Sequence, residues 1–124
     1  MLSSFPQDTS IANAEPLPPI SLNREYTRSE LELWVEHYAN EYGVSSDTMK
    51  QVITCESGWN TDIQSRHTRP DGSQEQSFGL VQIFLPAHPY ISYEQAVDPI
   101  FSIEFMAKSF AEGNATWWTC YNHD

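Results

Sequence analysis

The sequence predicts one small α+β domain that is mostly helical, with a polar hairpin or loop after its second helix. Three observations support this fold class. The chain has 124 residues, which suits a single domain and leaves no room for a second. Apolar residues recur at helical spacing in three separate stretches. Between the second and third stretches, residues 60–76 are polar and contain the strong turn signal Pro70-Asp71-Gly72.

Residues 1–26 are expected to form an extended, proline-rich arm that precedes the domain at 27–124. Prolines interrupt helix formation in this stretch, and no apolar periodicity is visible. The arm either links the domain to another one upstream or wraps over its surface. The first ten residues have no basic start and no apolar core, so we recognise no signal peptide there.

The first helix is predicted to begin near Ser29 and to end at Gly43. Two pairs, Thr27 with Glu30 and Ser29 with Glu32, match the S/T-x-x-E capping pattern. The residues that follow at spacings of three and four form one apolar face: Leu31, Trp34, Val35, Tyr38 and Tyr42. Glycine is a common helix terminator, which places the end at Gly43.

The second helix is predicted from Ser46 to Gly58, and an acidic residue shares its inward face. That face contains Met49, Val52, Ile53 and Glu56. After the polar excursion comes the short apolar run Phe78–Phe84, which periodicity alone leaves open as strand or helix.

The C-terminal third is predicted to contain two helix starts and a short final segment. Ser92–Gln95 repeats the capping box, and Asp98 followed by Pro99 is a typical cap and first turn. A helical apolar face then runs to Gly113, with members Ile100, Ile103, Met106, Ala107 and Phe110. The last segment, Ala115–Tyr121, carries two tryptophans and a cysteine.

The net charge of −11 excludes several classes of partner. Nucleic-acid affinity comes mainly from Lys and Arg on phosphates, and the six basic residues here do not cluster. Anionic membrane surfaces are disfavoured for the same reason. No apolar stretch is long enough to span a membrane. The four histidines are scattered, so we expect no metal and no cofactor. A monomer is the default expectation.

Glu56 is unusual for its position. An apolar surrounding disfavours the charged carboxylate and raises its pKa, and a protonated carboxyl can serve as the general acid of glycoside cleavage. The alternative is a helix-end glutamate that turns to water or pairs with Arg66 or Arg69. The two cysteines, Cys55 and Cys120, can form one disulfide or remain as two buried thiols.

Three motifs in order resemble the lytic transglycosylase and goose-type lysozyme family. Glu56-Ser57-Gly58-Trp59-Asn60 is similar to the family's Glu-Ser-Gly-aromatic-Asn, and Gly79-Leu80-Val81-Gln82-Ile83 to its Gly-Leu-Met-Gln-Ile. Trp117 followed by Tyr121-Asn122 is similar to its terminal Tyr-Asn. Together with the predicted helix that carries Glu56, the resemblance covers residues 46 to 122. The sequence departs from the family at Val81, where methionine is usual, and at Gln76-Ser77, where Gly-Ala is usual.

The resemblance implies a lysozyme-like fold and cleavage of the β-1,4 bond between N-acetylmuramic acid and N-acetylglucosamine in peptidoglycan glycan strands. It implies that Glu56 protonates the glycosidic oxygen and then acts as base. It assigns substrate contacts to Ser57, Ser73, Ser77, Gln82 and Tyr121, with a close backbone approach at Gly79. Structural roles remain open for these residues: a helix cap for Ser57, a loop hydrogen bond for Gln82 and core packing for Tyr121.

The implied fold would also bring Cys55 to Cys120, favouring a disulfide and an extracytoplasmic working place. A hydrolase would need a second carboxylate, for which the excursion offers Asp62, Asp71 and Glu75. Asp71 suits a turn better, so we favour the transglycosylase outcome. Two other classes remain as alternatives: a non-catalytic glycan-binding or structural module of a secreted or phage assembly, and a helical interaction domain.

Overall fold

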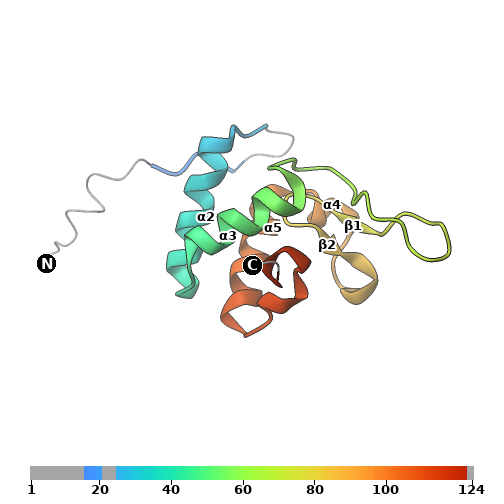
Figure 1. The fold of residues 1–124 in the computed structure, drawn as a ribbon. Coiled ribbons are helices and arrows are strands. Elements are labelled where there is room, and N and C mark those ends of the chain that lie inside the picture. Colours follow the sequence, from blue (N-terminus) through green and yellow to red (C-terminus); the bar gives the residue numbers. More distant parts are fainter. Residues whose placement is uncertain (1–15, 21–24, 123–124) are drawn as a thin grey trace, which may run out of the picture.

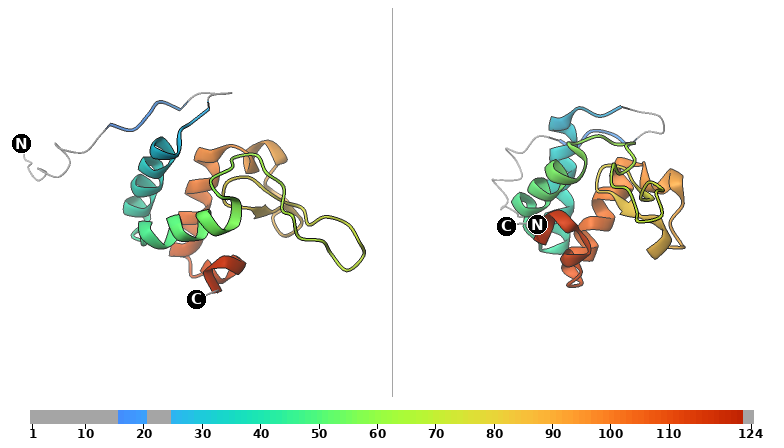
Figure 2. Two further views of the ribbon diagram at one scale, coloured as in Figure 1. Left: turned by 45° about the horizontal axis from the view of Figure 1, so that its top comes forward. Right: turned by 45° about the vertical axis from the view of Figure 1, so that its right-hand side comes forward.

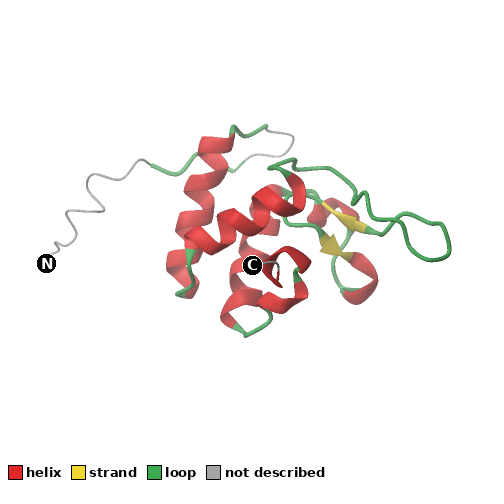
Figure 3. Ribbon diagram, viewed as in Figure 1, coloured by secondary structure: helices red, strands yellow, loops and turns green. Residues whose placement is uncertain are grey.

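The computed structural model describes residues 16–20 and 25–122. It has a small, mostly helical α+β fold (Figures 1 and 3), as the sequence predicts. In chain order the elements are α2 (Arg28–Tyr42), α3 (Ser46–Ser57), β1 (Ser77–Phe78), β2 (Ile83–Phe84), η1 (Leu85–Ala87), α4 (Tyr93–Ala96), α5 (Pro99–Ala111), η2 (Ala115–Trp117) and η3 (Thr119–Asn122).

The predicted arm lies largely outside the described residues. Residues 16–20 have no regular secondary structure, and Pro18 is buried. The hydroxyl of Tyr26, just before α2, donates a hydrogen bond of 3.1 Å to the carbonyl of Pro19. This part of the arm is therefore held against the start of the domain.

Helix α2 begins one residue earlier than predicted, because the first of the two capping patterns is the one used. Thr27 accepts from the backbone N–H of Glu30, and the Glu30 carboxylate accepts from the N–H of Thr27. Gly43 ends the helix in the left-handed conformation, at φ 72°. Helix α2 packs against α5 and α3 (Figure 2) through buried Leu31, Trp34, Val35 and Ala39.

Helix α3 has the predicted bounds. The Ser45 hydroxyl caps its start, accepting from the N–H of Thr48, and Gly58 ends it at φ 62°. Met49 and Ile53 of its inward face are completely buried. The ensuing chain, residues 60–76, leaves the helices as a long loop (Figures 1 and 2). Two isolated β-bridges hold it: Gln64 pairs with Phe78 of β1, and Thr68 pairs with Gln74 within the loop.

The run at 78–84 is neither one strand nor one helix but a tight hairpin. Strands β1 and β2 pair antiparallel, with Phe78 opposite Ile83, and residues 79–82 form the turn. Leu80 and Val81 in the turn are fully buried, which explains the apolar run. At Gly79 a Cβ would lie 2.0 Å from the carbonyl oxygen of Ala96, so the predicted close backbone approach is confirmed.

The C-terminal third follows its predicted caps. Ser92 and Gln95 form a capping box at α4, and Asp98 caps α5 through the N–H groups of Ile100 and Phe101. Helix α5 supplies the centre of the core with Ile103, Met106 and Ala107. The final segment folds as two short 3₁₀ helices, and η3 packs on α3. None of the described helices has the length and apolar character that crossing a membrane would require.

Candidate functional site

Glu56 lies in the last turn of α3, at the edge of the buried face rather than inside it. Its side chain is half-buried, whereas Met49, Val52 and Ile53 on the same face are buried. The helix ends at Gly58, so the chain turns away directly after the carboxylate. Glu56 therefore combines contact with the core and access to solvent.

A cleft of about 580 Å³ opens beside this carboxylate. Its walls come from the end of α3, the start of the excursion, the β1–β2 turn and η3. The lining residues are Cys55, Glu56, Ser57, Gly58, Asn60, Ile63, Gln64, Ser65, Arg66, His67, Gln82, Thr119 and Cys120. Among these described residues, Glu56 is the one carboxylate, and Arg66 and His67 supply the basic groups.

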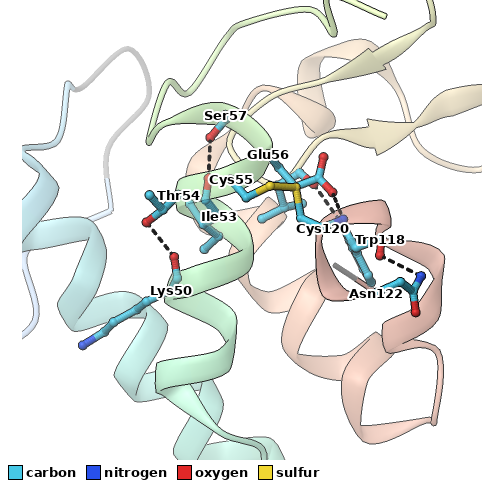
Figure 4. The surroundings of a disulfide bond; sticks show 10 residues. Lys50, Ile53, Thr54, Cys55, Glu56, Ser57, Trp118, Cys120 and Asn122 are labelled. Carbon is cyan, nitrogen blue, oxygen red and sulfur yellow. Dashed lines mark hydrogen bonds between the residues drawn. A yellow bond between two sulfur atoms is a disulfide. The ribbon is translucent and has the colours of Figure 1, made fainter. Parts of the chain in front are cut away.

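The predicted disulfide between Cys55 and Cys120 is present, and it joins the residue before Glu56 to η3. The Cα atoms of the two cysteines are 6.0 Å apart. In addition, the backbone N–H of Cys120 donates a hydrogen bond of 3.1 Å to Oε2 of Glu56. Figure 4 shows the carboxylate beside this bridge. One covalent bond and one hydrogen bond thus fix Glu56 relative to the C-terminal segment.

Ser57 lines the cleft and also ties α3 to the β hairpin. Its hydroxyl donates to the carbonyl of Leu80 at 2.6 Å and accepts from the N–H of Trp59 at 3.1 Å. The side chain is only 8% exposed. This contact therefore positions the turn that follows Glu56, a role closer to the expected structural one than to direct binding.

Gln82 reaches the cleft from the β1–β2 turn, where it adopts a left-handed backbone at φ 62°. Such a conformation is uncommon for a residue other than glycine and is stabilised only by its surroundings. Here the side-chain Nε2 donates to the carbonyls of Ile63 and Gly79, both at 2.9 Å. Both amide hydrogens are used inside the loop, so the amide oxygen is the group that can serve a ligand.

The other three predicted contact residues lie away from this cleft. Ser73 lines a separate hollow with Arg69 and Asp71. Ser77 is buried, and its hydroxyl donates to the carboxylate of Glu75 at 2.7 Å. Tyr121 is 41% exposed and packs edge-on against Phe110, with ring centroids 5.8 Å apart.

The three carboxylates considered as partners of Glu56 are also absent from the residues that line the cleft. Asp71 accepts from the N–H and hydroxyl of Ser73, at 2.9 and 2.6 Å, and these bonds lower the pKa of Asp71. Its expected turn role is thereby confirmed. Glu75 is engaged by Ser77, and Asp62 is exposed.

The sequence analysis considers Arg66 only as a residue that could pair with Glu56, and it does not predict that Arg66 or His67 lines the cleft. Their position depends on the path of the excursion, which carries no periodic signal. In the described ranges 16–20 and 25–122, no three His, Cys, Asp or Glu side chains are grouped so as to hold a metal ion.

Comparisons of this chain with protein-family models, curated proteins and solved structures found no match. The cleft thus sets one carboxyl group, held by a backbone amide, among amide and hydroxyl groups and the two basic residues Arg66 and His67, and a carboxyl group in such a position can transfer a proton to a bound ligand.

Proposed function

We propose that this protein cleaves the β-1,4 bond between N-acetylmuramic acid and N-acetylglucosamine in peptidoglycan, as a lytic transglycosylase of lysozyme-like fold. The observation that carries the proposal is the position of Glu56, half-buried at the wall of a 580 Å³ cleft and hydrogen-bonded by the N–H of Cys120. The three ordered motifs that contain Glu56, Gln82 and Tyr121 add the substrate class.

In the first step, the protonated Glu56 carboxyl donates its proton to the glycosidic oxygen. The bond from that oxygen to C1 of the muramic acid breaks, and the N-acetylglucosamine leaves with a free hydroxyl. The Glu56 carboxylate then takes the proton of the C6 hydroxyl of the muramic acid. The O6 atom attacks C1 and closes a 1,6-anhydro ring, so the enzyme returns to its starting state without consuming water.

The composition of the cleft favours this outcome over hydrolysis. An inverting hydrolase holds its water with a second carboxylate roughly 6.5–9.5 Å from the acid. Among the described lining residues, Glu56 is the one carboxylate. Intramolecular attack by O6 needs no second carboxylate, because the nucleophile is part of the bound sugar.

The surroundings of Glu56 support its role through preorganisation. A proton donor must be held at a fixed position relative to the leaving oxygen, because small displacements reduce rate steeply. The Cys55–Cys120 bridge and the Cys120 amide provide that constraint. A disulfide at this place also agrees with an extracytoplasmic protein, since such bonds persist in oxidising compartments.

The test compares wild-type protein with Glu56→Gln on purified peptidoglycan, followed by mass spectrometry of the soluble muropeptides. We expect 1,6-anhydro muropeptides from the wild type and at least a roughly hundredfold lower yield from Glu56→Gln, because the amide cannot donate the proton. Asp62→Asn serves as the matched control, since Asp62 is an exposed carboxylate outside the cleft.

Two results would change the conclusion. Reducing-end products instead of anhydro products would mean that water attacks and that the protein is a hydrolase of the same bond. An absence of products from wild-type protein on several wall types would contradict the enzymatic function and leave a glycan-binding or structural module.

A further inference from the structure

The Cys55–Cys120 bridge lies next to the Glu56 carboxylate (Figure 4) and forms part of the cleft wall. Cys55 is exposed and Cys120 is half-buried. These two residues are all the cysteines of the chain, and neither is a free thiol. Access and the attacking thiolate control the reduction of a disulfide. A dithiol in solution can therefore reach this bridge, and it finds no other disulfide in the chain.

The segment that the bridge holds, η3 (Thr119–Asn122), has few other attachments. None of its residues is buried, although Cys120 touches the edge of the core. The side chain of Asn122 donates its hydrogen bonds within the C-terminal segment. Tyr121 is 41% exposed and meets Phe110 edge-on. The bridge and the Cys120 amide are the bonds that fasten η3 to the end of α3.

The chain just before η3 is anchored without the bridge. Trp118 is 3% exposed, and its Nε1 donates to the carbonyl of Val81 at 2.6 Å. The fully buried residues of α2, α3 and α5 pack on one another through side chains that do not belong to η3. Weakly held segments open at a lower free-energy cost than the whole fold. Loss of the bridge should therefore release residues 119–122 and leave Trp118 and the core in place.

Release of η3 would change the surroundings of Glu56 directly. The N–H of Cys120 donates to Oε2 of Glu56 at 3.1 Å, and this donor moves with η3. Thr119 and Cys120 also form one side of the cleft. The carboxylate would lose its backbone donor, and the cleft would lose that wall. Because proton transfer depends steeply on the position of the donor, both changes should slow the reaction.

We propose that the Cys55–Cys120 bridge is a redox switch of the Glu56 site. The oxidised protein holds the acid in place and is active, and the protein reduced by a dithiol releases η3 and is inactive. This inference rests on the proposed function and concerns the regulation of the same site. Cellular thiol systems keep most such bridges reduced in the cytosol, whereas oxidising compartments preserve them. The site of a chain in a reducing compartment thus stays inactive until the chain is oxidised.

The switching step is a thiol–disulfide exchange with an external dithiol. A thiolate of the dithiol attacks Sγ of the exposed Cys55, the bond between the two sulfur atoms breaks, and Cys120 leaves as a thiolate. The second thiol then attacks the mixed disulfide and releases Cys55. Two electrons pass to the bridge, the two thiol protons end on the cysteines, and the dithiol becomes a disulfide. An oxidised dithiol reverses each step.

The first test measures cleavage in the two redox states. Wild-type protein is assayed for muropeptide release before and after incubation with dithiothreitol, and alkylation with mass spectrometry verifies that both cysteines are reduced. We expect the reduced protein to release at least about tenfold less, because a misplaced donor reduces the rate steeply. Removal of dithiothreitol and addition of oxidised glutathione should restore the yield.

The matched control is the double variant Cys55→Ser/Cys120→Ser. It lacks the bridge in either condition, so its yield should be as low as that of the reduced wild type and should not respond to dithiothreitol. A response of this variant would show that the reagent acts elsewhere and would contradict the assignment of the switch to the bridge.

The second test does not depend on activity. Proton–nitrogen correlation spectra of the oxidised and reduced proteins should show the amide signals of residues 119–122 moving to positions typical of unstructured chain. The signals of Val35 and Ile103, which are fully buried in the core, should keep their positions. Disappearance of these core signals would overturn the inference, because the inactivation would then follow from global unfolding.

The two tests separate this inference from the proposed function. An unchanged yield after complete reduction would overturn the switch and leave the proposed function intact. If the oxidised wild type releases no muropeptides, the proposed function fails. The amide signals of residues 119–122 then decide on their own whether the bridge holds η3 at Glu56: signals that do not move on reduction overturn that contact, and signals that move support it.

Discussion

Replacing Gly79 by alanine is expected to destabilise the fold far more than the same replacement at Gly72. Both glycines have a left-handed backbone, at φ 88° and 90°. An alanine in this conformation costs about 1–2 kcal/mol at either position. At Gly72 nothing lies within 4 Å of the added Cβ, so the conformational cost is the whole effect.

At Gly79 the added Cβ would also lie 2.0 Å from the carbonyl oxygen of Ala96 and 3.0 Å from its carbon. Both atoms belong to the backbone, and that oxygen already accepts from the Ser102 hydroxyl at 2.7 Å. Relief of the overlap must move the β1–β2 turn, at a further cost of roughly 1–3 kcal/mol. The carbonyl of Gly79, which holds the Gln82 side chain, would move with it.

Urea unfolding followed by far-ultraviolet circular dichroism measures the difference between the two variants. At an m-value of about 2 kcal/mol/M, Gly72→Ala should lower the midpoint by roughly 0.5–1 M and Gly79→Ala by at least about 0.5 M more. Equal losses would refute the reasoning, because they would mean that the contact with Ala96 imposes no constraint.

Two further predictions concern the ties between distant segments. Replacing Cys55 and Cys120 together by serine should cost about 4 kcal/mol of unfolding free energy, since the bridge closes a loop with a sequence separation of 65 residues; a loss under about 1 kcal/mol in urea unfolding would contradict this. The Tyr42 hydroxyl donates to Glu104 at 2.8 Å, and this bond raises the pKa of Tyr42 from 10.0 to about 12. Because the folded-state pKa lies above the unfolded one, the stabilisation is complete below pH 10 and is lost as the pH rises toward 12. Ultraviolet titration should find a tyrosine with a pKa of about 12 that Tyr42→Phe removes and Tyr90→Phe does not. Burial also raises the pKa of Tyr38, so the assignment depends on the change caused by Tyr42→Phe, and an unchanged titration curve of the late-ionising groups in that variant would refute it.

The helices could be predicted because their signals are local. The caps at Thr27, Ser92 and Asp98 form within three residues of the side chain that makes them. The same locality explains the small error at α2. Two overlapping capping patterns are equally good in sequence, and only the completed structure selects Thr27.

The β1–β2 hairpin could not be predicted from the run at 78–84, because its apolar residues face the core from a turn rather than from one side of a strand. Leu80 and Val81 are buried at its tip, and Gln82 adopts a left-handed backbone that sequence rules assign to glycine. One of the two hydrogen bonds that the Gln82 side chain donates reaches Ile63, 19 residues earlier. No local pattern contains that information.

The residues of the candidate site show the same difference between local sequence signals and contacts distant in sequence. Glu56, Ser57 and Gln82 come from motifs, and the structure brings all three to one cleft. Ser73 and Ser77 lie outside the three motifs, in and directly after the polar excursion, and the structure places them away from the cleft. The position of a residue in a long loop depends on contacts distant in sequence, so hydroxyl chemistry alone could not select them.

Three cross-links near Glu56 join helix α3, the β1–β2 hairpin and the C-terminal segment in pairs. The Ser57 hydroxyl joins α3 to the hairpin at Leu80, and the Trp118 indole joins the hairpin at Val81 to the C-terminal segment. The Cys55–Cys120 bridge joins that segment back to α3. Each of the three segments also contributes a residue to the cleft: Ser57 from α3, Gln82 from the hairpin and Cys120 from the C-terminal segment.

This arrangement explains how the Glu56 carboxylate is held in place although the described residues have little regular secondary structure outside the helices. The β sheet has two strands of two residues each, too small to fix the position of Glu56 by its own rigidity. Cross-links between α3, the turn and η3 supply that rigidity instead. Two of the three cross-links involve residues that line the cleft, Ser57 and the Cys55–Cys120 bridge, so loss of either should loosen Glu56 while the other two cross-links still join the three segments.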